Sequence, residues 1–215
     1  MSTPAHRARL VLALRSAGIT DTATLSAIES VPRELFVPET FIDRAYEDTA
    51  LPIGYGQTLS QPLVVATMIQ ALELNPRVKL LEVGTGSGYH AAILSHLCRR
   101  VYTIERHRPL LAEAIKRFEA LGLHNVTTRA GDGMKGWPEQ APFDRISVTA
   151  AGEEPPQSLL DQLKVGGIML MPIGAQSRIQ QLMKFRRTED GYDSQAIMDV
   201  RFVPLLPGLA SDTGT

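Results

Sequence analysis

Apolar side chains recur at helical spacing in three places before residue 75. Leu10 and Leu14 lie on one face of a first helix, and Leu25 and Ile28 mark a second, shorter one. The capping residues and first-turn prolines that open the three helices are Thr3-Pro4, Asp21 and Ser60-Gln61-Pro62. Residues 31–61 are punctuated by proline and glycine, and we expect them to be irregular. Because a long irregular stretch in a compact domain is usually functional, we expect it to contribute to a site.

After Asn75-Pro76 the pattern changes to short apolar runs that alternate with amphipathic segments. The runs predict strands at residues 79–83, 100–104, 126–130, 144–149 and 168–171. The segments between them predict helices at residues 89–97, 109–121 and 156–163, the last one stopped by Gly166-Gly167. Such alternation indicates right-handed crossovers and a parallel sheet that is covered on both faces.

The end of the chain departs from this alternation. Residues 180–187 and 195–204 are strand-like and flank the turn Glu189-Asp190-Gly191, which predicts a hairpin at one edge of the sheet. The expected fold class is α/β, with a doubly wound, mostly parallel, Rossmann-like sheet, a helical N-terminal extension and a C-terminal β-hairpin. We expect a single domain over residues 1–215, with the extension at 1–60, the α/β core at 61–175 and the C-terminal region at 176–207.

Composition narrows the classes of partner and compartment. The 215 residues are 44% hydrophobic and carry a net charge of −1, so we expect a globular protein with no nucleic-acid partner. The single cysteine, Cys98, excludes an intrachain disulfide and a thiolate metal cluster, and the five histidines are too scattered to predict a metal site. Because no apolar stretch is long enough to span a bilayer and no signal segment is present, we expect a cytoplasmic protein without a membrane partner.

A glycine-rich turn, Gly84-Thr85-Gly86-Ser87-Gly88, stands between a predicted buried strand and a helix. Glycine suits a turn that visits positive φ and lets a ligand approach the backbone, although a purely structural turn is the alternative. The G-x-G-x-G spacing differs from the dinucleotide and phosphate-loop patterns. Glu82, two residues before the first glycine, would repel a phosphate but could accept hydrogen bonds from an ammonium group. An amino-acid end of the ligand is therefore favoured over a phosphate.

Two further acidic residues follow neighbouring strands. Glu105 ends the second predicted strand, where a carboxylate can accept hydrogen bonds from both hydroxyls of a ribose; its alternative is an ion pair with Arg106 or Arg108. Asp132, beside Gly133, follows the third strand and could accept from an adenine amino group, or form only a turn. Because the carboxyl ends of parallel strands meet at one edge of a sheet, these positions together indicate S-adenosyl-L-methionine as the cofactor.

Further motifs extend along nearly the whole chain. They occupy residues 31–38, 45–54, 57–62, 81–89, 131–133, 144–146, 148–151 and 200–205. Over these motifs the chain resembles the protein-L-isoaspartate (D-aspartate) O-methyltransferase family. The segments Thr58-Leu59-Ser60-Gln61-Pro62 and Arg201-Phe202-Val203-Pro204-Leu205 are more specific than the glycine loop, which many methyltransferases share.

The resemblance implies methyl transfer from S-adenosyl-L-methionine to the α-carboxylate of L-isoaspartyl residues in damaged proteins and peptides, which starts their repair through a succinimide. It implies that Ser60 is catalytic and that cofactor contacts come from Gln57, Thr58, Leu59, Ser60, Gly84, Glu105, Asp132 and Gly133. It also implies that the substrate lies along Ser60 and along Phe202, Val203, Pro204 and Leu205. The chain departs from the family at His90, where bacterial members usually carry glutamine, and at residues 63–65, where some members carry histidines.

The implied chemistry needs no base, because a carboxylic acid with a pKa of about 4 is already ionised at neutral pH. We therefore expect catalysis by in-line positioning and desolvation. Ser60, at the start of a predicted helix, could orient the carboxylate while the helix N–H groups add positive potential. A simple helix cap is the alternative role for Ser60, and the two roles are compatible.

Two other classes of function compete with this interpretation. A methyltransferase could act on a nucleic acid or a small metabolite, but Thr149-Ala150-Ala151-Gly152 lacks the Asn-Pro-Pro-Tyr of many base methylases. A non-catalytic binding module could retain the fold, but it would have no need of Ser60, Glu82 and Glu105. The expected partners are therefore isoaspartyl-containing proteins and peptides, bound by a monomer.

Overall fold

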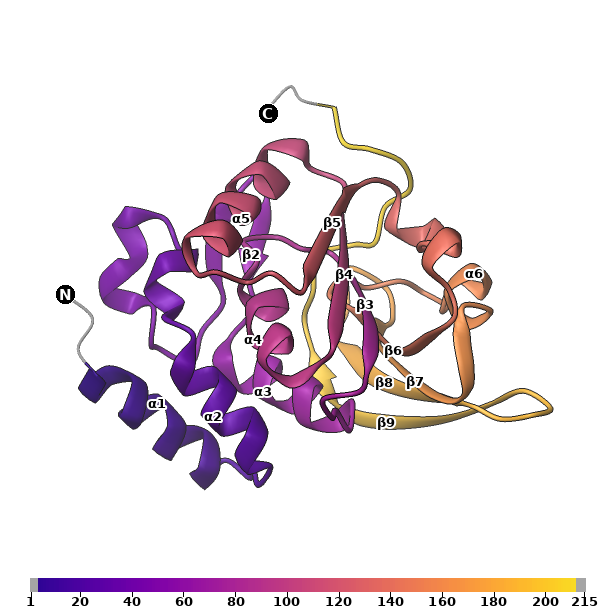
Figure 1. Cartoon of the computed structure of the whole chain (residues 1–215), viewed down its shortest axis with the longest axis horizontal. Coiled ribbons are helices and arrows are strands. Elements are labelled where there is room, and N and C mark those ends of the chain that lie inside the picture. Colours follow the sequence, from indigo (N-terminus) through magenta and orange to yellow (C-terminus); the bar gives the residue numbers. More distant parts are fainter. Residues whose placement is uncertain (1–3, 212–215) are drawn as a thin grey trace.

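The computed structural model of the chain describes residues 4–211, and a seven-stranded sheet forms its centre (Figure 1). The strands lie in the order β5-β4-β3-β6-β7-β8-β9. Their bounds are β3 Lys79–Val83, β4 Arg100–Glu105, β5 Val126–Ala130, β6 Phe143–Val148, β7 Leu163–Ile173, β8 Gln180–Arg187 and β9 Tyr192–Val200. This order confirms the predicted α/β class.

The winding of the sheet reverses at β3. This strand pairs in parallel with β4 on one side and with β6 on the other, although β6 comes much later in the chain. In such sheets a crevice opens at the reversal, beyond the carboxyl ends of the strands, and ligands bind there. β8 pairs antiparallel with both β7 and β9, which confirms the predicted C-terminal hairpin, although its second strand spans Tyr192–Val200 and not the predicted residues 195–204.

Hydrophobic clusters cover both faces of the sheet. The helices are α1 Pro4–Ser16, α2 Thr22–Ser30, α3 Pro62–Ala71, α4 Tyr89–Leu97, α5 Arg108–Ala120 and α6 Gln157–Leu160. Leu80 of β3 belongs to the cluster that includes Ile93 of α4, whereas Leu81 belongs to the cluster of Leu159 and Leu160 from α6. Adjacent strand residues point to opposite faces, so both faces of β3 are buried, as its continuous apolar run predicts.

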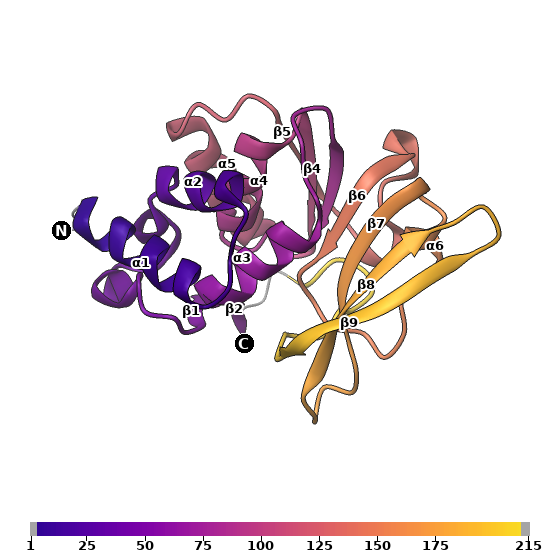
Figure 2. The same ribbon diagram turned by 90° about the horizontal axis from the view of Figure 1, so that it is seen from below.

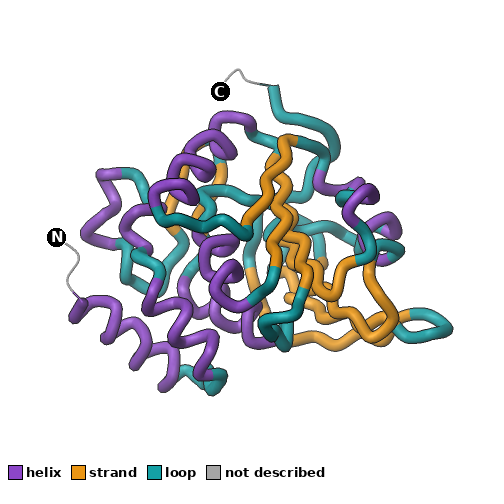
Figure 3. Tube along the Cα trace, viewed as in Figure 1, coloured by secondary structure: helices purple, strands orange, loops and turns teal. Residues whose placement is uncertain are grey.

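The N-terminal helices gather on the side of the molecule away from the β8–β9 hairpin (Figures 2 and 3). Asp21 caps α2 by accepting a hydrogen bond of 3.0 Å from the backbone N–H of Thr24, as predicted for the start of this helix. Thr3, predicted to cap the first helix, lies outside the described residues. None of the helices within residues 4–211 is long and apolar enough to cross a bilayer.

The prediction of an irregular stretch over residues 31–61 is only partly right. The stretch holds two short 3-10 helices, η1 Arg33–Phe36 and η2 Glu39–Arg44, and a small antiparallel sheet of β1 Leu51–Gly54 and β2 Gln57–Leu59. Its hairpin turn places Gly54, Tyr55 and Gly56 at positive φ. The strands are too short to show an alternation of polar and apolar residues. Tyr55 has a positive φ, which a non-glycine residue rarely adopts, so the sequence does not predict the turn.

The fifth strand of the core is longer than predicted. The helix expected at 156–163 ends at Leu160, and β7 already begins at Leu163. Phe143 pairs with Leu163 and Arg145 pairs with Ile168, so the extra residues of β7 form a bulge. Gly166, at φ 77°, provides the conformation that the bulge needs. The two glycines thus bend a strand and do not stop a helix.

Candidate active site

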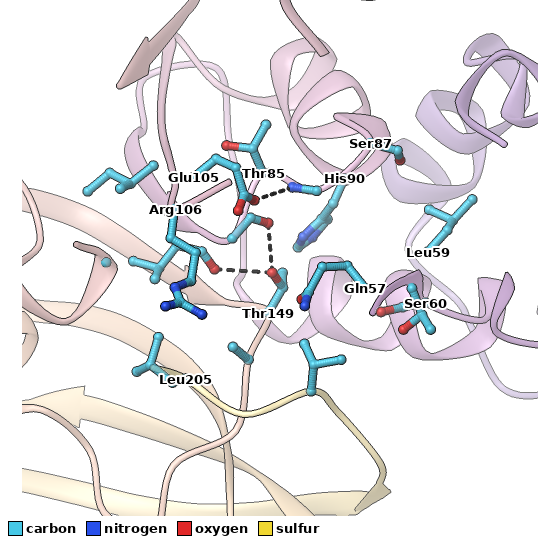
Figure 4. A pocket seen from close by; sticks show the side chains of 18 of the residues that line it. Gln57, Leu59, Ser60, Thr85, Ser87, His90, Glu105, Arg106, Thr149 and Leu205 are labelled. Atoms are coloured by element: carbon cyan, nitrogen blue, oxygen red, sulfur yellow. Dashed lines mark hydrogen bonds between the residues drawn. The ribbon is translucent and has the colours of Figure 1, made fainter. Parts of the chain in front are cut away.

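A cavity with an empty volume of about 860 Å³, open to solvent, lies beyond the carboxyl ends of β3 and β4 (Figure 4). The predicted site residues that line it are Gln57, Thr58, Leu59, Ser60, Gly84, Thr85, Gly86, Ser87, Glu105, Gly133, Val203, Pro204 and Leu205. The predicted site residues that do not line it are Glu82, Gly88, Asp132 and Phe202. Segments far apart in the sequence therefore meet at one crevice, as the strand order requires.

The glycine loop fits against the end of β6. Gly84 and Gly86 have φ values of 97° and 54°, which favour glycine over other residues. A Cβ on Gly84 would lie 2.3 Å from Oγ1 of Thr149, and this hydroxyl donates a hydrogen bond of 2.7 Å to the Gly84 carbonyl. The close approach of Thr149 therefore requires glycine at position 84, and its hydrogen bond fixes the path of the loop from the neighbouring strand.

Gly88 has a packing role that differs from the role of Gly84 and Gly86. It is the N-cap of α4 at φ 92°, and a Cβ there would lie 2.8 Å from the Phe118 ring of α5. Its role in the structure is thus close packing between helices, which explains why it does not line the cavity.

Glu105 holds the glycine loop by one carboxylate oxygen and the start of α5 by the other. Oε2 accepts a hydrogen bond of 2.8 Å from the N–H of Gly86, and Oε1 accepts one of 2.9 Å from the N–H of His107. Each carboxylate oxygen can accept a second hydrogen bond, so Glu105 retains acceptor capacity toward a diol. The alternative ion pair with Arg106 or Arg108 is absent from the described residues. The Arg106 guanidinium reaches instead the carbonyls of Pro207 and Gly208, at 3.5 and 3.4 Å.

Glu82 is fully buried behind the loop, and the geometry does not support the predicted direct contact of its carboxylate with a ligand. Thr103 Oγ1 donates a 2.5 Å hydrogen bond to Oε2 of Glu82 and lies 2.6 Å from Oγ1 of Thr85. Because the Thr103 proton is used on Glu82, Thr85 must be the donor of the second bond. The Nδ1 atom of His90 lies 3.3 Å from Oε1 of Glu82. Glu82 thus organises three side chains of the site.

Asp132 and Gly133 follow β5, as predicted. The Asp132 side chain accepts a 2.9 Å hydrogen bond from the N–H of Met134 and caps the 3-10 helix η3 Gly133–Lys135. A Cβ on Gly133 would lie 2.4 Å from Cγ1 of Val83, so glycine is needed for the close approach of this turn to β3. Asp132 thus has a role in the turn, and this role leaves the second oxygen of its carboxylate with acceptor capacity, so the adenine contact stays a prediction.

Ser60 is not the cap of α3. The N-cap is Gln61, and within the described residues the Ser60 hydroxyl has no intrachain hydrogen bond. Asp48 satisfies the helix start instead, since its Oδ1 accepts a 2.8 Å hydrogen bond from the N–H of Leu63. This carboxylate also opposes the positive potential that we expected from the helix N-terminus. The Ser60 side chain, partly exposed in the cavity wall, is left available for a ligand (Figure 4).

The segment after β9 forms the wall opposite the glycine loop. Its backbone pairs with Ala151: the Ala151 N–H donates to the Val203 carbonyl at 2.8 Å, and the Leu205 N–H donates to the Ala151 carbonyl at 2.7 Å. The N–H of Phe202 donates to Oε1 of the fully buried Gln180 at 2.8 Å. Phe202 itself is buried in the core, so the cavity receives Val203, Pro204 and Leu205.

Three polar lining residues were not predicted as site residues. They are His90, Arg106 and Thr149. Thr149 and Arg106 follow the strands β6 and β4, so strand ends alone could have found them. His90 could be identified as a lining residue only from the position of the first turn of α4 in the structure. Among the described residues no group of histidine, cysteine and carboxylate side chains could hold a metal ion.

Comparison with known proteins identifies the family of the chain. A sequence model described as protein-L-isoaspartate (D-aspartate) O-methyltransferase matches residues 5–210. A protein-L-isoaspartate O-methyltransferase of Rhodospirillum centenum is 60% identical over 99% of this chain and 96% of its own length. The same-named protein of Paramagnetospirillum magneticum is 58% identical over 95% of this chain and 96% of its own length.

Solved structures show the same fold. A protein-L-isoaspartate O-methyltransferase superposes with a TM-score of 0.85 at 30% identity, covering 97% of this chain and 67% of that one. A Plasmodium falciparum structure in complex with S-adenosyl-L-homocysteine superposes with a TM-score of 0.81 at 24% identity, covering 94% of this chain and 98% of that one. The family match and the identities together establish that this chain belongs to the protein-L-isoaspartate (D-aspartate) O-methyltransferase family.

Proposed function

We propose that the chain carries out the reaction of its family in the cavity at the end of β3, with Ser60 as the residue that orients the acceptor. The reaction transfers a methyl group from S-adenosyl-L-methionine to the α-carboxylate of an L-isoaspartyl residue. One observation carries the proposal: Ser60 and the segment of Val203, Pro204 and Leu205 line the same cavity as the glycine loop. An acceptor held by these walls would face a donor held by the loop.

The residues of the cavity fit the cofactor. Gly84 and Gly86 line the cavity without side chains, so their backbone is accessible to a ligand, and Glu105 retains acceptor capacity toward a ribose diol. The buried Ser87 Oγ and His90 Nε2 have no hydrogen-bond partner within the described residues, which is unfavourable unless a ligand supplies one. Gln57, Thr58 and Leu59 would lie along the opposite side of the cofactor. Asp132 does not line the cavity, but it precedes Gly133, which does, and its second oxygen would accept from the adenine amino group at that edge.

The role of the protein in the reaction is positioning. S-adenosyl-L-methionine, when bound, supplies an electrophilic methyl group on a positively charged sulfur. The Ser60 hydroxyl donates a hydrogen bond to one oxygen of the substrate carboxylate and leaves the other oxygen free to attack in line. Val203, Pro204 and Leu205 exclude water from that oxygen, so that its charge is desolvated before it is neutralised by methyl transfer. No base is required, because the carboxylate is already ionised.

The product ester then leaves the protein for its own chemistry. The backbone nitrogen that follows the isoaspartyl residue attacks the ester carbonyl and expels methanol, which forms a succinimide. Hydrolysis of the succinimide at one of its two carbonyls restores an ordinary aspartyl linkage, while the other route returns the isoaspartyl form. The chain therefore needs no residue for the second stage.

Two peptides that differ only in one linkage test the proposal. The protein is incubated with methyl-labelled S-adenosyl-L-methionine and either an isoaspartyl or an aspartyl peptide. Base-labile label on the isoaspartyl peptide alone is the expected result. Label on both peptides, or on neither while the cofactor binds, would show that the acceptor is different.

We also propose that the chain works as a single-domain monomer in the cytoplasm on isoaspartyl proteins and peptides, without a nucleic-acid partner. The buried free thiol of Cys98 is compatible with a reducing compartment. Sedimentation equilibrium with and without an isoaspartyl peptide tests the oligomeric state, and cell fractionation tests the compartment.

A further inference from the structure

His90 lies in the first turn of α4 with its ring in the wall of the cofactor cavity (Figure 4). Only 7% of the residue is exposed. One ring nitrogen, Nδ1, lies 3.3 Å from Oε1 of Glu82. The other, Nε2, is buried and has no hydrogen-bond partner within the described residues. A buried polar atom without a partner at the wall of a ligand cavity indicates that the ligand supplies one.

The surroundings of the ring decide which nitrogen carries the proton. From β3, the Glu82 carboxylate faces Nδ1, and from β4, Thr103 donates to the other oxygen of that carboxylate. If Nδ1 were bare, its lone pair would face a carboxylate oxygen and repel it. The proton therefore belongs on Nδ1, which leaves Nε2 as a bare acceptor in a neutral ring.

The contact between His90 and Glu82 is a loose one. Charge-assisted hydrogen bonds between a charged nitrogen and a carboxylate have typical lengths of about 2.7–2.9 Å. The 3.3 Å contact between His90 and Glu82 is longer than this, and Oε1 of Glu82 forms no hydrogen bond in the described residues. The ring is thus oriented by Glu82 without the geometry of a tight imidazolium pair.

We propose that Nε2 of His90 accepts a hydrogen bond from the α-ammonium group of S-adenosyl-L-methionine, and that Glu82 acts as a positioning residue for the ring. The inference rests on the proposed cofactor site. It transfers to His90 the ammonium contact that the sequence suggested for Glu82, whose carboxylate is too deeply buried to make it. The Glu82 charge still favours the ammonium group, through the polarised ring between them.

Binding measurements with S-adenosyl-L-homocysteine test the proposal without turnover. We expect His90→Leu to weaken this ligand by roughly tenfold or more, the effect of losing one hydrogen bond to a charged group. His90→Gln should keep most of the affinity, because an amide oxygen is also an acceptor. His96→Leu, on the exposed side of the same helix, is the matched control and should leave the affinity unchanged.

Two analogues of S-adenosyl-L-homocysteine separate the ligand groups. In one, hydrogen replaces the α-amino group, and we expect His90→Leu to have no effect on its affinity. In the other, hydrogen replaces the carboxylate, and the effect of His90→Leu should persist. An equal loss with all three ligands would assign His90 to packing and overturn the proposal. If His90→Leu weakens every ligand except the analogue without the carboxylate, the ring donates a hydrogen bond to that carboxylate. This result would also overturn the proposal.

Histidine ¹⁵N spectra provide an independent reading of the ring. The wild-type protein should show a His90 ring with Nδ1 protonated and Nε2 bare, and Glu82→Gln should shift the ring toward the other tautomer. A protonated Nε2 in the wild type would contradict the proposal. If the wild type does not bind S-adenosyl-L-homocysteine at all, the cofactor site itself is wrong, which is a different outcome from either failure of His90.

Discussion

The guanidinium of Arg33 donates a hydrogen bond of 2.7 Å from Nη2 to the backbone carbonyl of Ser60. Its Nε donates a second bond of 2.7 Å to the carbonyl of Ala45, and its Cζ atom lies 4.8 Å from the centre of the Tyr89 ring. Arg33 is fully buried, and burial lowers the pKa of its guanidinium below the ordinary value. One side chain of the N-terminal extension thus ties the segment that carries Ser60 to the helix that follows the glycine loop.

Arg33→Lys should therefore impair both stability and catalysis. Lysine keeps the charge but cannot reach two carbonyls with a planar fork, so one buried acceptor loses its partner. We expect unfolding free energy to fall by about 1–3 kcal/mol and turnover on an isoaspartyl peptide to fall more than affinity for S-adenosyl-L-homocysteine. Urea unfolding, steady-state kinetics and ligand binding measure the three quantities. An unchanged turnover at reduced stability would limit Arg33 to a structural role.

Ser60→Ala should lower turnover far more than cofactor affinity. A hydrogen bond to a charged group is worth roughly 1.5–3 kcal/mol, which corresponds to a loss of about 10- to 150-fold if it forms in the transition state. Ser60→Thr retains the hydroxyl and is the control. Because Gln61 and not Ser60 is the N-cap of α3, neither variant should lose helix stability. Full turnover of Ser60→Ala would remove this residue from the mechanism.

Asp48, which the sequence did not single out, should carry the stability of α3. Its carboxylate bonds to the N–H of Leu63, so Asp48→Ala should lower the unfolding free energy by about 1 kcal/mol. Asp48→Asn keeps an acceptor oxygen and should lose much less. Glu47→Ala is the neighbouring control, since its carboxylate forms only an exposed ion pair with Arg44. Equal losses for the alanine and asparagine variants of Asp48 would point to its charge near Arg33.

Gly84→Ala should abolish tight cofactor binding. The added Cβ would lie 2.3 Å from Oγ1 of Thr149, at a φ of 97° that alanine rarely adopts. Gly166→Ala is a matched control with a positive φ of 77° and no atom within 4 Å of the added Cβ. Both variants should lose about 1–2 kcal/mol of stability from backbone strain, and Gly84→Ala should lose more because Thr149 must shift. Calorimetry with S-adenosyl-L-homocysteine should find weaker binding only for Gly84→Ala, and comparable binding by both variants would contradict the cradle role of the loop.

The sequence predicted the parts of the site that strand ends determine. Glu105, Gly84 and Gly133 follow buried strands of one parallel sheet, so the winding rule brings them together without further information. The burial of Glu82 could not be predicted in this way, because its carboxylate contacts Thr103 and His90, which lie on other elements. A pattern along one strand does not reveal partners across the sheet.

The capping of α3 shows the same limit at longer range. Asp48 is separated from Leu63 by 15 residues, and local helix-start rules consider only the residues directly before a helix. These rules pointed to Ser60, whereas the β1–β2 hairpin brings Asp48 to the helix start and leaves the serine hydroxyl available. The alternation rule did not predict the hairpin, because its strands are short. The prediction that Ser60 caps α3 was wrong for that reason.

Cys98 predicts how stability changes at alkaline pH. Burial raises the pKa of its thiol from 9.0 to about 12 in the folded protein. Between these pH values the unfolded chain loses the thiol proton and the folded chain keeps it, so the stability of the fold declines as pH rises. Burial also raises the pKa of Tyr89 from 10.0 to about 12, so this side chain adds to the decline in stability above about pH 10.

Cys98→Ala removes only the contribution of the cysteine to this decline. Between about pH 8 and pH 10 the wild type should lose about 1.4 kcal/mol more unfolding free energy than this variant. Urea unfolding at both pH values measures the difference, and parallel losses would show that the thiol is not protected by burial.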